Sequence, residues 1–94
     1  MIRVLIERRL SPGTAETFAA LMREMRRDAV QARGYISGET LRDVDDPHHS
    51  VIVSTWRSQL DWDAWAVSPA RQRARLRIAP LLAQPERVTV LEPA

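Results

Sequence analysis

Residues 2–34, IRVLIERRLSPGTAETFAALMREMRRDAVQARG, contain two different hydrophobic periods. The first apolar residues recur at every second position, which predicts a strand over residues 2–9. The Ser-Pro-Gly triplet at 11–13 interrupts that pattern. Beyond it, apolar residues recur at helical spacing, which predicts a helix over residues 15–33, with Gly34 as the residue that ends it.

The rest of the chain predicts two more strands, a helical region and a last strand. β-Branched and apolar residues favour strands over 35–43 and 50–57, joined by a polar turn as an antiparallel hairpin. A last strand is expected over 87–92. The order is β-α-β-β-α-β, and right-handed crossovers then give a ferredoxin-like α+β sandwich, a four-stranded antiparallel sheet with two helices on one face. We treat residues 1–94 as a single domain.

Three hydroxyl residues are candidate helix N-caps, because their side-chain oxygens can accept a hydrogen bond from the first helical turn. Thr14 precedes the first helix. Ser58, followed three residues later by Asp61, marks the start of the second helical region. Ser68 precedes a proline, so we expect this region to be broken or kinked there and to end near Ile78.

Apolar residues point to both faces of the predicted sheet. In the first strand Val4 and Ile6 point one way and Leu5 the other, and in the third strand Val53 opposes Ile52. Two helices cover one face, and a chain of 94 residues has no further element for the other. We therefore expect a homodimer in which a second copy of the sheet covers it, burying more than ~1,200 Å² in total.

The composition excludes several classes of protein. No cysteine is present, which excludes a disulfide framework, a thiolate metal site and a cysteine nucleophile. No apolar run is long enough to span a membrane, and the N-terminus lacks the pattern of a signal peptide, so we expect a cytoplasmic protein. The basic residues are all arginine and the net charge is +2. We attribute the missing lysine to codon bias and expect no nucleic-acid partner, because only 71–77 concentrates basic charge.

Motifs for other chemistries are absent. An RNA-binding platform of this strand order needs exposed aromatics on the central strands, and the first strand has none. Asp43, Asp45, Asp46, His48 and His49 lie close together, but they lack the spacing of a metal site and fit a polar hairpin turn. The chain also lacks a nucleophile motif and a glycine-rich phosphate loop. We expect neither a metal nor a cofactor.

Three tryptophans fall within ten positions and are the most informative residues of the chain. Trp62 and Trp65 are three residues apart on a predicted helix and share a face, while Trp56 ends a strand. We interpret Trp56 and Trp62 as core anchors, because each ring buries a large apolar area. Trp65 is the candidate for the wall of a ligand pocket, on the grounds given next.

The segment Trp56–Ser68 has the pattern W-R-S-x-x-x-W-x-x-W-x-x-S. Together with Pro12-Gly13 and with Gly34–Glu39, it resembles the antibiotic biosynthesis monooxygenase family of the dimeric α+β barrel superfamily. The resemblance covers nearly the whole chain. It implies a homodimer whose sheets pack face to face as a barrel, and a pocket in each subunit between the helices and the sheet.

Members of that family differ in activity. Some oxidise aromatic polyketides with dioxygen and no cofactor; others degrade haem with an asparagine, a tryptophan and a histidine. The matching positions here are Glu7, Trp65 and Arg75, and arginine is no neutral axial ligand, so we do not expect haem degradation. The quinone-forming branch has an asparagine, a tryptophan and an arginine around its pocket. Trp65 and either Arg71 or Arg75 match the last two, but the chain has no asparagine.

The resemblance leads to two hypotheses. The first is a cofactor-independent, monooxygenase-like protein acting on a small aromatic or quinone-type compound. Trp65, Arg71 and His48 then bind the substrate, while His49, as a proton acceptor, and Arg75, as an anion holder, are the candidate catalytic residues. The alternative is a non-catalytic dimeric module of the same fold that binds or senses a small molecule. A pocket beside Trp65 with convergent polar groups would favour the first.

Overall fold

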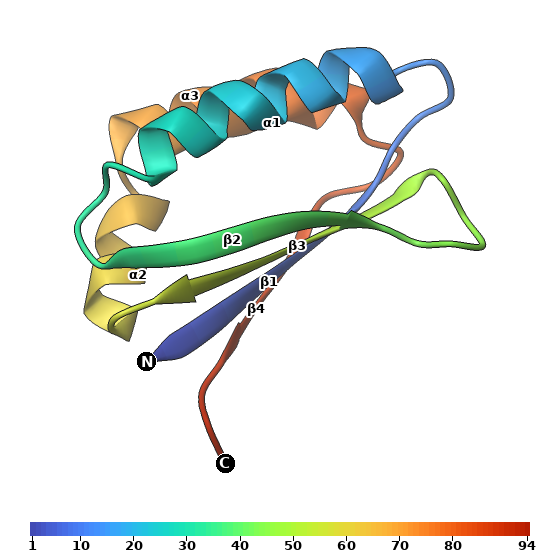
Figure 1. Cartoon of the computed structure of the whole chain (residues 1–94). Helices are drawn as coiled ribbons and strands as arrows, with labels where there is room; N and C mark the ends of the chain where they lie inside the picture. Colours follow the sequence, from blue (N-terminus) through green and yellow to red (C-terminus); the bar gives the residue numbers. More distant parts are fainter.

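The computed structural model describes residues 1–94 as a four-stranded sheet with one helical layer (Figure 1). Its elements are β1 (Ile2–Arg9), α1 (Ala15–Ala29), β2 (Tyr35–Arg42), β3 (His49–Trp56), α2 (Gln59–Ala66), α3 (Pro69–Ile78), the short 3-10 helix η1 (Ala79–Leu81) and β4 (Arg87–Leu91). The strands are antiparallel, in the order β2-β3-β1-β4. This confirms the predicted ferredoxin-like α+β fold. No helix is long and apolar enough to cross a membrane.

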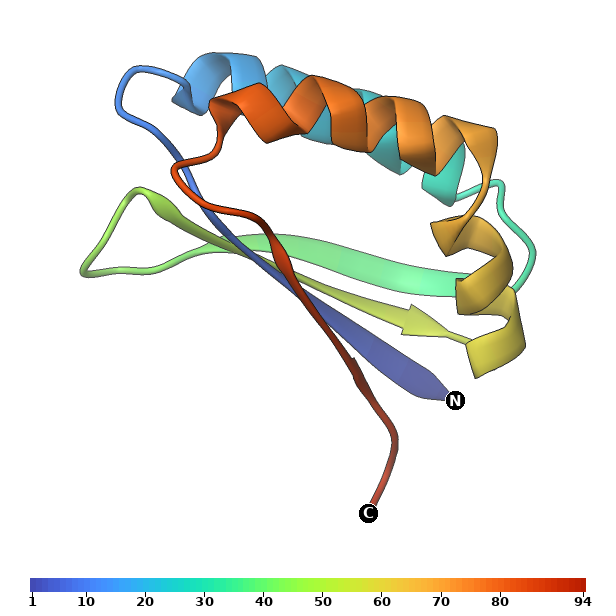
Figure 2. The same ribbon diagram turned by 180° about the vertical axis from the view of Figure 1, so that it is seen from behind.

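The predicted break in the second helical region separates α2 from α3. Ser58 Oγ accepts a hydrogen bond from the backbone N–H of Asp61, and Ser68 Oγ accepts one from that of Arg71, each at 3.2 Å. Pro69 begins α3, because its missing N–H costs nothing in the first helical turn. As a result α3 lies beside α1 across one face of the sheet, while α2 lies where β3 ends (Figures 1 and 2).

Helix α1 differs from the prediction at both ends. The Thr14 hydroxyl does not cap the helix; it donates a hydrogen bond to the carbonyl of Ser11 at 2.7 Å instead. The helix ends at Ala29, earlier than expected, and turns carry the chain on to Gly34. Gly34 has a φ of +84°, and a Cβ at this position would collide with Asp61 of α2. Glycine is therefore required where the end of the α1 turn meets α2.

The register of the sheet confirms that both faces carry apolar side chains. Ile2, Val4 and Ile6 of β1 are buried beneath the helices, together with Trp56 of β3. The helix-free face, which we define by Leu5, Leu41, Val51, Val53 and Leu91, includes side chains that are half-buried or exposed. Leu41 and Leu91 are each 47% exposed, so this face of the isolated chain leaves apolar area in contact with water.

The core beneath the helices consists of two clusters. One contains Ile2, Val4, Ile6, Trp56, Trp62 and Trp65; the other contains Leu10, Phe18, Leu21, Met22 and Ile78. Met25 of α1 and Ile52 of β3 are partly buried and pack against both clusters. The cavity that we consider as the functional site is lined by residues of both clusters.

Candidate functional site

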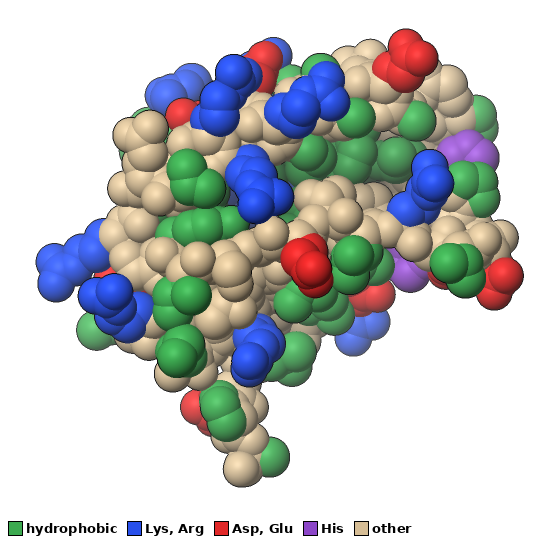
Figure 3. All heavy atoms as spheres, viewed as in Figure 1, with side chains coloured by type: hydrophobic (Ala, Val, Ile, Leu, Met, Phe, Trp, Pro, Cys, Tyr) green, Lys and Arg blue, Asp and Glu red, His purple; other side chains and the backbone are tan.

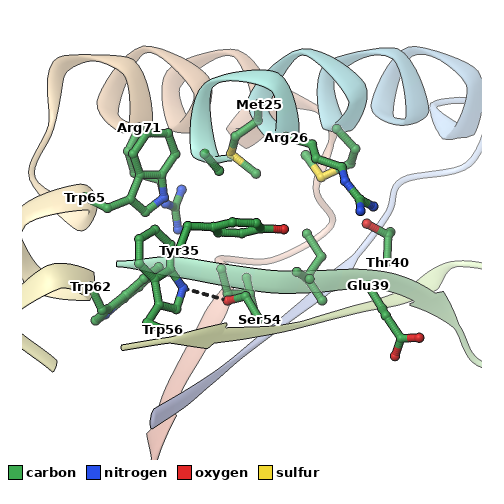
Figure 4. A pocket seen from close by; sticks show the side chains of 15 residues that line it. Met25, Arg26, Tyr35, Glu39, Thr40, Ser54, Trp56, Trp62, Trp65 and Arg71 are labelled. Atoms are coloured by element: carbon green, nitrogen blue, oxygen red, sulfur yellow. Dashed lines mark hydrogen bonds between the residues drawn. The ribbon is translucent and has the colours of Figure 1, made fainter. Parts of the chain in front are cut away.

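A small cavity lies between α1 and the sheet and is closed at one end by the tryptophans (Figure 4). We call it the inner cavity; its volume is about 60 Å³. It is lined by Ile6, Met22, Met25, Arg26, Ala29, Tyr35, Gly38, Glu39, Thr40, Ile52, Ser54, Trp56, Trp62, Trp65 and Arg71. A water occupies about 30 Å³ in the liquid, so this space holds two waters or one edge of a ligand, but not a whole aromatic ring.

The tryptophans pack as one aromatic cluster around Trp56. The ring centroid of Trp56 lies 5.6 Å from that of Trp62 and 6.3 Å from that of Trp65, and the Tyr35 ring contacts it edge-on at 5.4 Å. The Trp56 indole N–H donates a hydrogen bond to Ser54 Oγ at 3.0 Å. All three tryptophans are buried and all three line the inner cavity. Burial therefore does not separate a structural Trp62 from a ligand-contacting Trp65.

Arg71, one of the lining residues, belongs to a largely buried group of charges around Glu86. Glu86, in the loop before β4, accepts hydrogen bonds from Arg8 Nε at 2.9 Å, from Arg71 Nη2 at 3.3 Å and from Arg75 Nε at 3.1 Å. The side chains of Arg8 and Arg71 are 0% and 3% exposed, and that of Glu86 is 9% exposed. One carboxylate thus neutralises part of the charge of three guanidinium groups.

The pKa values of this group follow from burial and from mutual attraction. Burial lowers the pKa of both Arg8 and Arg71, and the negative charge of Glu86 opposes that shift. Burial alone would raise the pKa of Glu86, but the positive charges of Arg8, Arg71 and Arg75 outweigh it and lower that pKa. Glu86 is therefore ionised at neutral pH and holds all three arginines.

Arg71 also faces the inner cavity. Its Nη2 is bound by Glu86, but its Nη1 is buried and has no hydrogen-bond partner. In Figure 4 the guanidinium extends from α3 past Trp65 toward the space above Tyr35. An unsatisfied buried N–H of this kind is costly unless a ligand or a water completes it.

A second, wider hollow continues from the inner cavity along α1. We call it the outer groove; it has a volume of about 340 Å³ and shares Met22, Arg26 and Thr40 with the inner cavity. Its other lining residues are Leu10, Ala15, Phe18, Ala19, Arg23, Leu41, Arg42, Pro47 and Ser50. A cavity of about 150 Å³ is enough for a benzene ring, so the outer groove has room for a flat aromatic compound.

Comparison with known proteins identifies the family. The family model described as antibiotic biosynthesis monooxygenase matches residues 1–77. The chain belongs to the antibiotic biosynthesis monooxygenase family. This confirms the resemblance that the Trp56–Ser68 pattern indicated. A comparison with curated proteins finds no significant match.

Solved structures are similar to this chain over almost its whole length. An antibiotic biosynthesis monooxygenase structure is 19% identical, with a TM-score of 0.90, over 100% of this chain and 99% of the other. Rv0793 from Mycobacterium tuberculosis is 25% identical, with a TM-score of 0.90 over 99% and 94%. A conserved protein from Methanosarcina mazei Go1 is 14% identical, with a TM-score of 0.94 over 99% and 92%. These similarities support the fold.

In this antibiotic biosynthesis monooxygenase family member, the structure brings together two of the residues predicted from the sequence. Trp65 from α2 and Arg71 from α3 both line the inner cavity. Arg75 does not: it lies one turn further along α3, its side chain is 52% exposed, and its Nε contacts Glu86. Arg75 thus acts on the cavity only through the carboxylate that it shares with Arg71.

The two histidines lie away from the inner cavity. His49 pairs with Arg9 in the sheet register, and strand alternation places both on the helix-free face. Its Nδ1 lies 3.0 Å from Asp43 Oδ2 and its Nε2 lies 3.6 Å from Glu7 Oε1. The hydrogen bond with His49 lowers the pKa of Asp43. His48 is half-exposed in the hairpin turn, so neither imidazole lines the cavity within one chain.

Several residues of the site were not predicted. Arg8 had a signal: it continues the inward-facing series Ile2, Val4 and Ile6, and a charged residue at an inward position is unusual. The sequence carries no comparable signal for Glu86, because this residue lies in a loop without hydrophobic periodicity and far along the chain from Arg8. Gly38 leaves room for Tyr35, since a Cβ there would lie 2.7 Å from the tyrosine hydroxyl.

Proposed function

We propose that this protein is a cofactor-independent, monooxygenase-like protein that binds a small aromatic or quinone-type compound between α1 and the sheet. The ring lies in the outer groove and one edge enters the inner cavity. The observation that carries this proposal is Arg71, whose guanidinium borders a mostly apolar cavity beside Trp65 and has one buried nitrogen without a hydrogen-bond partner. A phenolate or enolate oxygen at the inner edge of a ligand would accept that hydrogen bond.

The proposed reaction needs little from the protein. Oxidation of an activated ring methylene to a carbonyl consumes one dioxygen: one oxygen atom enters the product and the other leaves as water, with all electrons supplied by the substrate. The chain contributes a dry, flat site and a fixed positive charge that favours the substrate anion. Arg71 is suited to that task because Glu86 holds its other nitrogen in place.

A second candidate function is favoured by the absence of a base from the cavity. No histidine lines the inner cavity, and the one carboxylate that borders it, Glu39, points away from it in Figure 4. A protein that binds an already ionised ligand, or that binds without catalysis, needs no such base. The alternative is thus a non-catalytic module of the same fold that binds or senses a small molecule.

Oxygen uptake with an anthrone separates these two functions. We expect wild-type protein to increase the uptake of dioxygen by 1,8-dihydroxyanthrone above the rate in buffer, with one dioxygen consumed per anthrone. Arg71→Lys should lower the protein-dependent rate by about tenfold or more, since it removes a charge-assisted hydrogen bond of fixed geometry. The matched control is Arg73→Lys, on the same helix and outside the cavity. Binding of the anthrone without added uptake would favour the non-catalytic module.

The helix-free face supports the proposal that the protein acts as a homodimer. Its apolar side chains, with Leu5 and Val53 at the centre, have no cover within one chain. Packing two such faces together removes apolar area from water. We expect sedimentation to give about 21 kDa, which is twice 10.7 kDa. Val53→Glu should shift the protein to the monomer, and a wild-type monomer at micromolar concentration would contradict this proposal.

A further inference from the structure

Arginines without carboxylate partners surround the mouth of the outer groove. Arg23 comes from α1 and Arg42 from β2 on the opposite side, while Arg26, also on α1, lies deeper, where the groove joins the inner cavity. None of the three has a carboxylate oxygen within 4.0 Å, and no carboxylate therefore competes with a ligand for them. The lining of the groove includes no aspartate or glutamate. The mouth of the groove therefore carries uncompensated positive charge from two facing elements.

The floor of the same groove is apolar. Leu10, Phe18 and Met22 are buried there. Figure 3 shows hydrophobic side chains inside the hollow between the helical layer and β2, with basic side chains beside it. A groove of this build is complementary to a flat apolar compound that carries an anionic group at one end.

The arrangement also gives the bound compound a direction. Arg26 reaches from α1 toward Thr40 on β2, where the outer groove joins the inner cavity (Figure 4). A ring on Phe18 and Met22 then has one edge toward Trp65 and the opposite end at the arginines of the mouth. The two ends of the ligand would thus meet different positive groups.

We propose that the outer groove selects an aromatic acid, with its ring on Phe18 and Met22 and its carboxylate held by Arg23 and Arg42. The inference rests on the proposed function, because it assumes that the ligand of the outer groove is the compound whose inner edge reaches Arg71. It deepens that function by naming the substrate class. The carboxylate is a fixed end that the protein uses for binding, and the reacting part of the molecule lies at the other end.

The test compares an acid with its neutral analogue. We would titrate 2-naphthoate and 2-naphthalenemethanol and follow tryptophan fluorescence, because all three tryptophans lie at the inner end of the site. Wild-type protein should bind 2-naphthoate at least about tenfold more tightly than the alcohol. Added salt should weaken the binding of the acid and leave that of the alcohol unchanged. Arg23→Gln and Arg42→Gln should each weaken binding of the acid about three- to tenfold and leave binding of the alcohol unchanged. The matched control, Arg27→Gln, is on α1 outside the groove and should change neither.

The outcomes separate this inference from the proposed function. Equal binding of acid and alcohol, with no effect of Arg23→Gln or Arg42→Gln, overturns the acid selectivity and leaves the aromatic site standing. If Arg27→Gln weakens binding of the acid as much as the groove variants do, the acid selectivity of the groove is overturned as well, because the effect then comes from the net charge of the protein. Failure of both compounds to bind overturns both proposals. Circular dichroism of each variant shows whether a loss of binding comes from unfolding.

Discussion

Replacing Glu86 with glutamine tests whether the buried charges hold the helical layer on the sheet. The carboxylate contacts Arg8 twice, at 2.8 and 2.9 Å, and Arg71 and Arg75 once each, at 3.3 and 3.1 Å. The variant keeps one acceptor oxygen but removes the negative charge and brings an NH₂ donor into the contacts. Two buried guanidinium groups are then left without compensation. Breaking a buried ion pair on one side costs about 3–5 kcal/mol.

That cost is large for a chain of this size, whose total free energy of unfolding we expect to be about 5–14 kcal/mol. Urea unfolding followed by tryptophan fluorescence is the assay, at one fixed protein concentration because a dimer makes the midpoint concentration-dependent. With an m-value of about 1–1.5 kcal/mol/M, the urea midpoint should fall by roughly 2–5 M. The control is Glu24→Gln, which breaks the half-exposed pair with Arg77 and should cost at most about 1 kcal/mol. An equal loss in the free energy of unfolding for Glu86→Gln and Glu24→Gln would show that the buried charges contribute no more than a surface ion pair.

The pH dependence of stability gives a second readout of the same carboxylate. The pKa of Glu86 is lowered by folding from an ordinary value of 4.5. Its contribution is therefore complete above that value and is lost as the pH falls through the lowered pKa of the folded state. Wild-type protein should lose stability in this acidic range, and Glu86→Gln should lose less over the same interval. A parallel loss in both proteins would show that other carboxylates dominate acid unfolding.

Three further changes test the fold and the placement of one histidine. Gly34→Ala should destabilise the protein by more than about 1 kcal/mol in urea unfolding, because its φ is +84° and the new Cβ meets Asp61; an unchanged midpoint would contradict this. Ser68→Ala removes an N-cap and should cost about 1 kcal/mol in the same assay, while an equal midpoint would mean that the cap contributes nothing. His49→Gln should raise the pKa of Asp43 toward 3.8 in a carboxyl NMR titration and leave naphthoate binding unchanged; weaker binding would place that histidine in the site.

The sequence was sufficient for features that depend on neighbouring residues. Alternation gave the strands, and the hydroxyl at Ser68 followed by a proline gave the break between α2 and α3, because both signals are local. The hydroxyl of Thr14 illustrates the limit of a local signal. Its partner is the carbonyl of Ser11, which competes with the helix N-terminus for the same side chain.

The parts of the site that were missed depend on register or on distant partners. The predicted strand began at residue 50, so His49 had no assigned face; in the structure it pairs with Arg9 and points away from the helices. A shift of one residue reverses the face of every side chain in a strand. The contact between Arg8 and Glu86 joins residues that are 78 positions apart, and no local feature of the sequence predicts it.

Arg71 connects the stability of the fold with the proposed function. One of its terminal nitrogens is bound by Glu86, the other is buried without a partner, and the residue lines the inner cavity. Three guanidinium groups around one carboxylate leave a local charge of 3 − 1 = +2, which favours an anion. A ligand with an anionic oxygen in the inner cavity would accept a hydrogen bond from Arg71 and would also reduce this net positive charge. Ligand binding and stability should therefore be coupled, and the same ligand should raise the free energy of unfolding with the logarithm of one plus its concentration over its Kd.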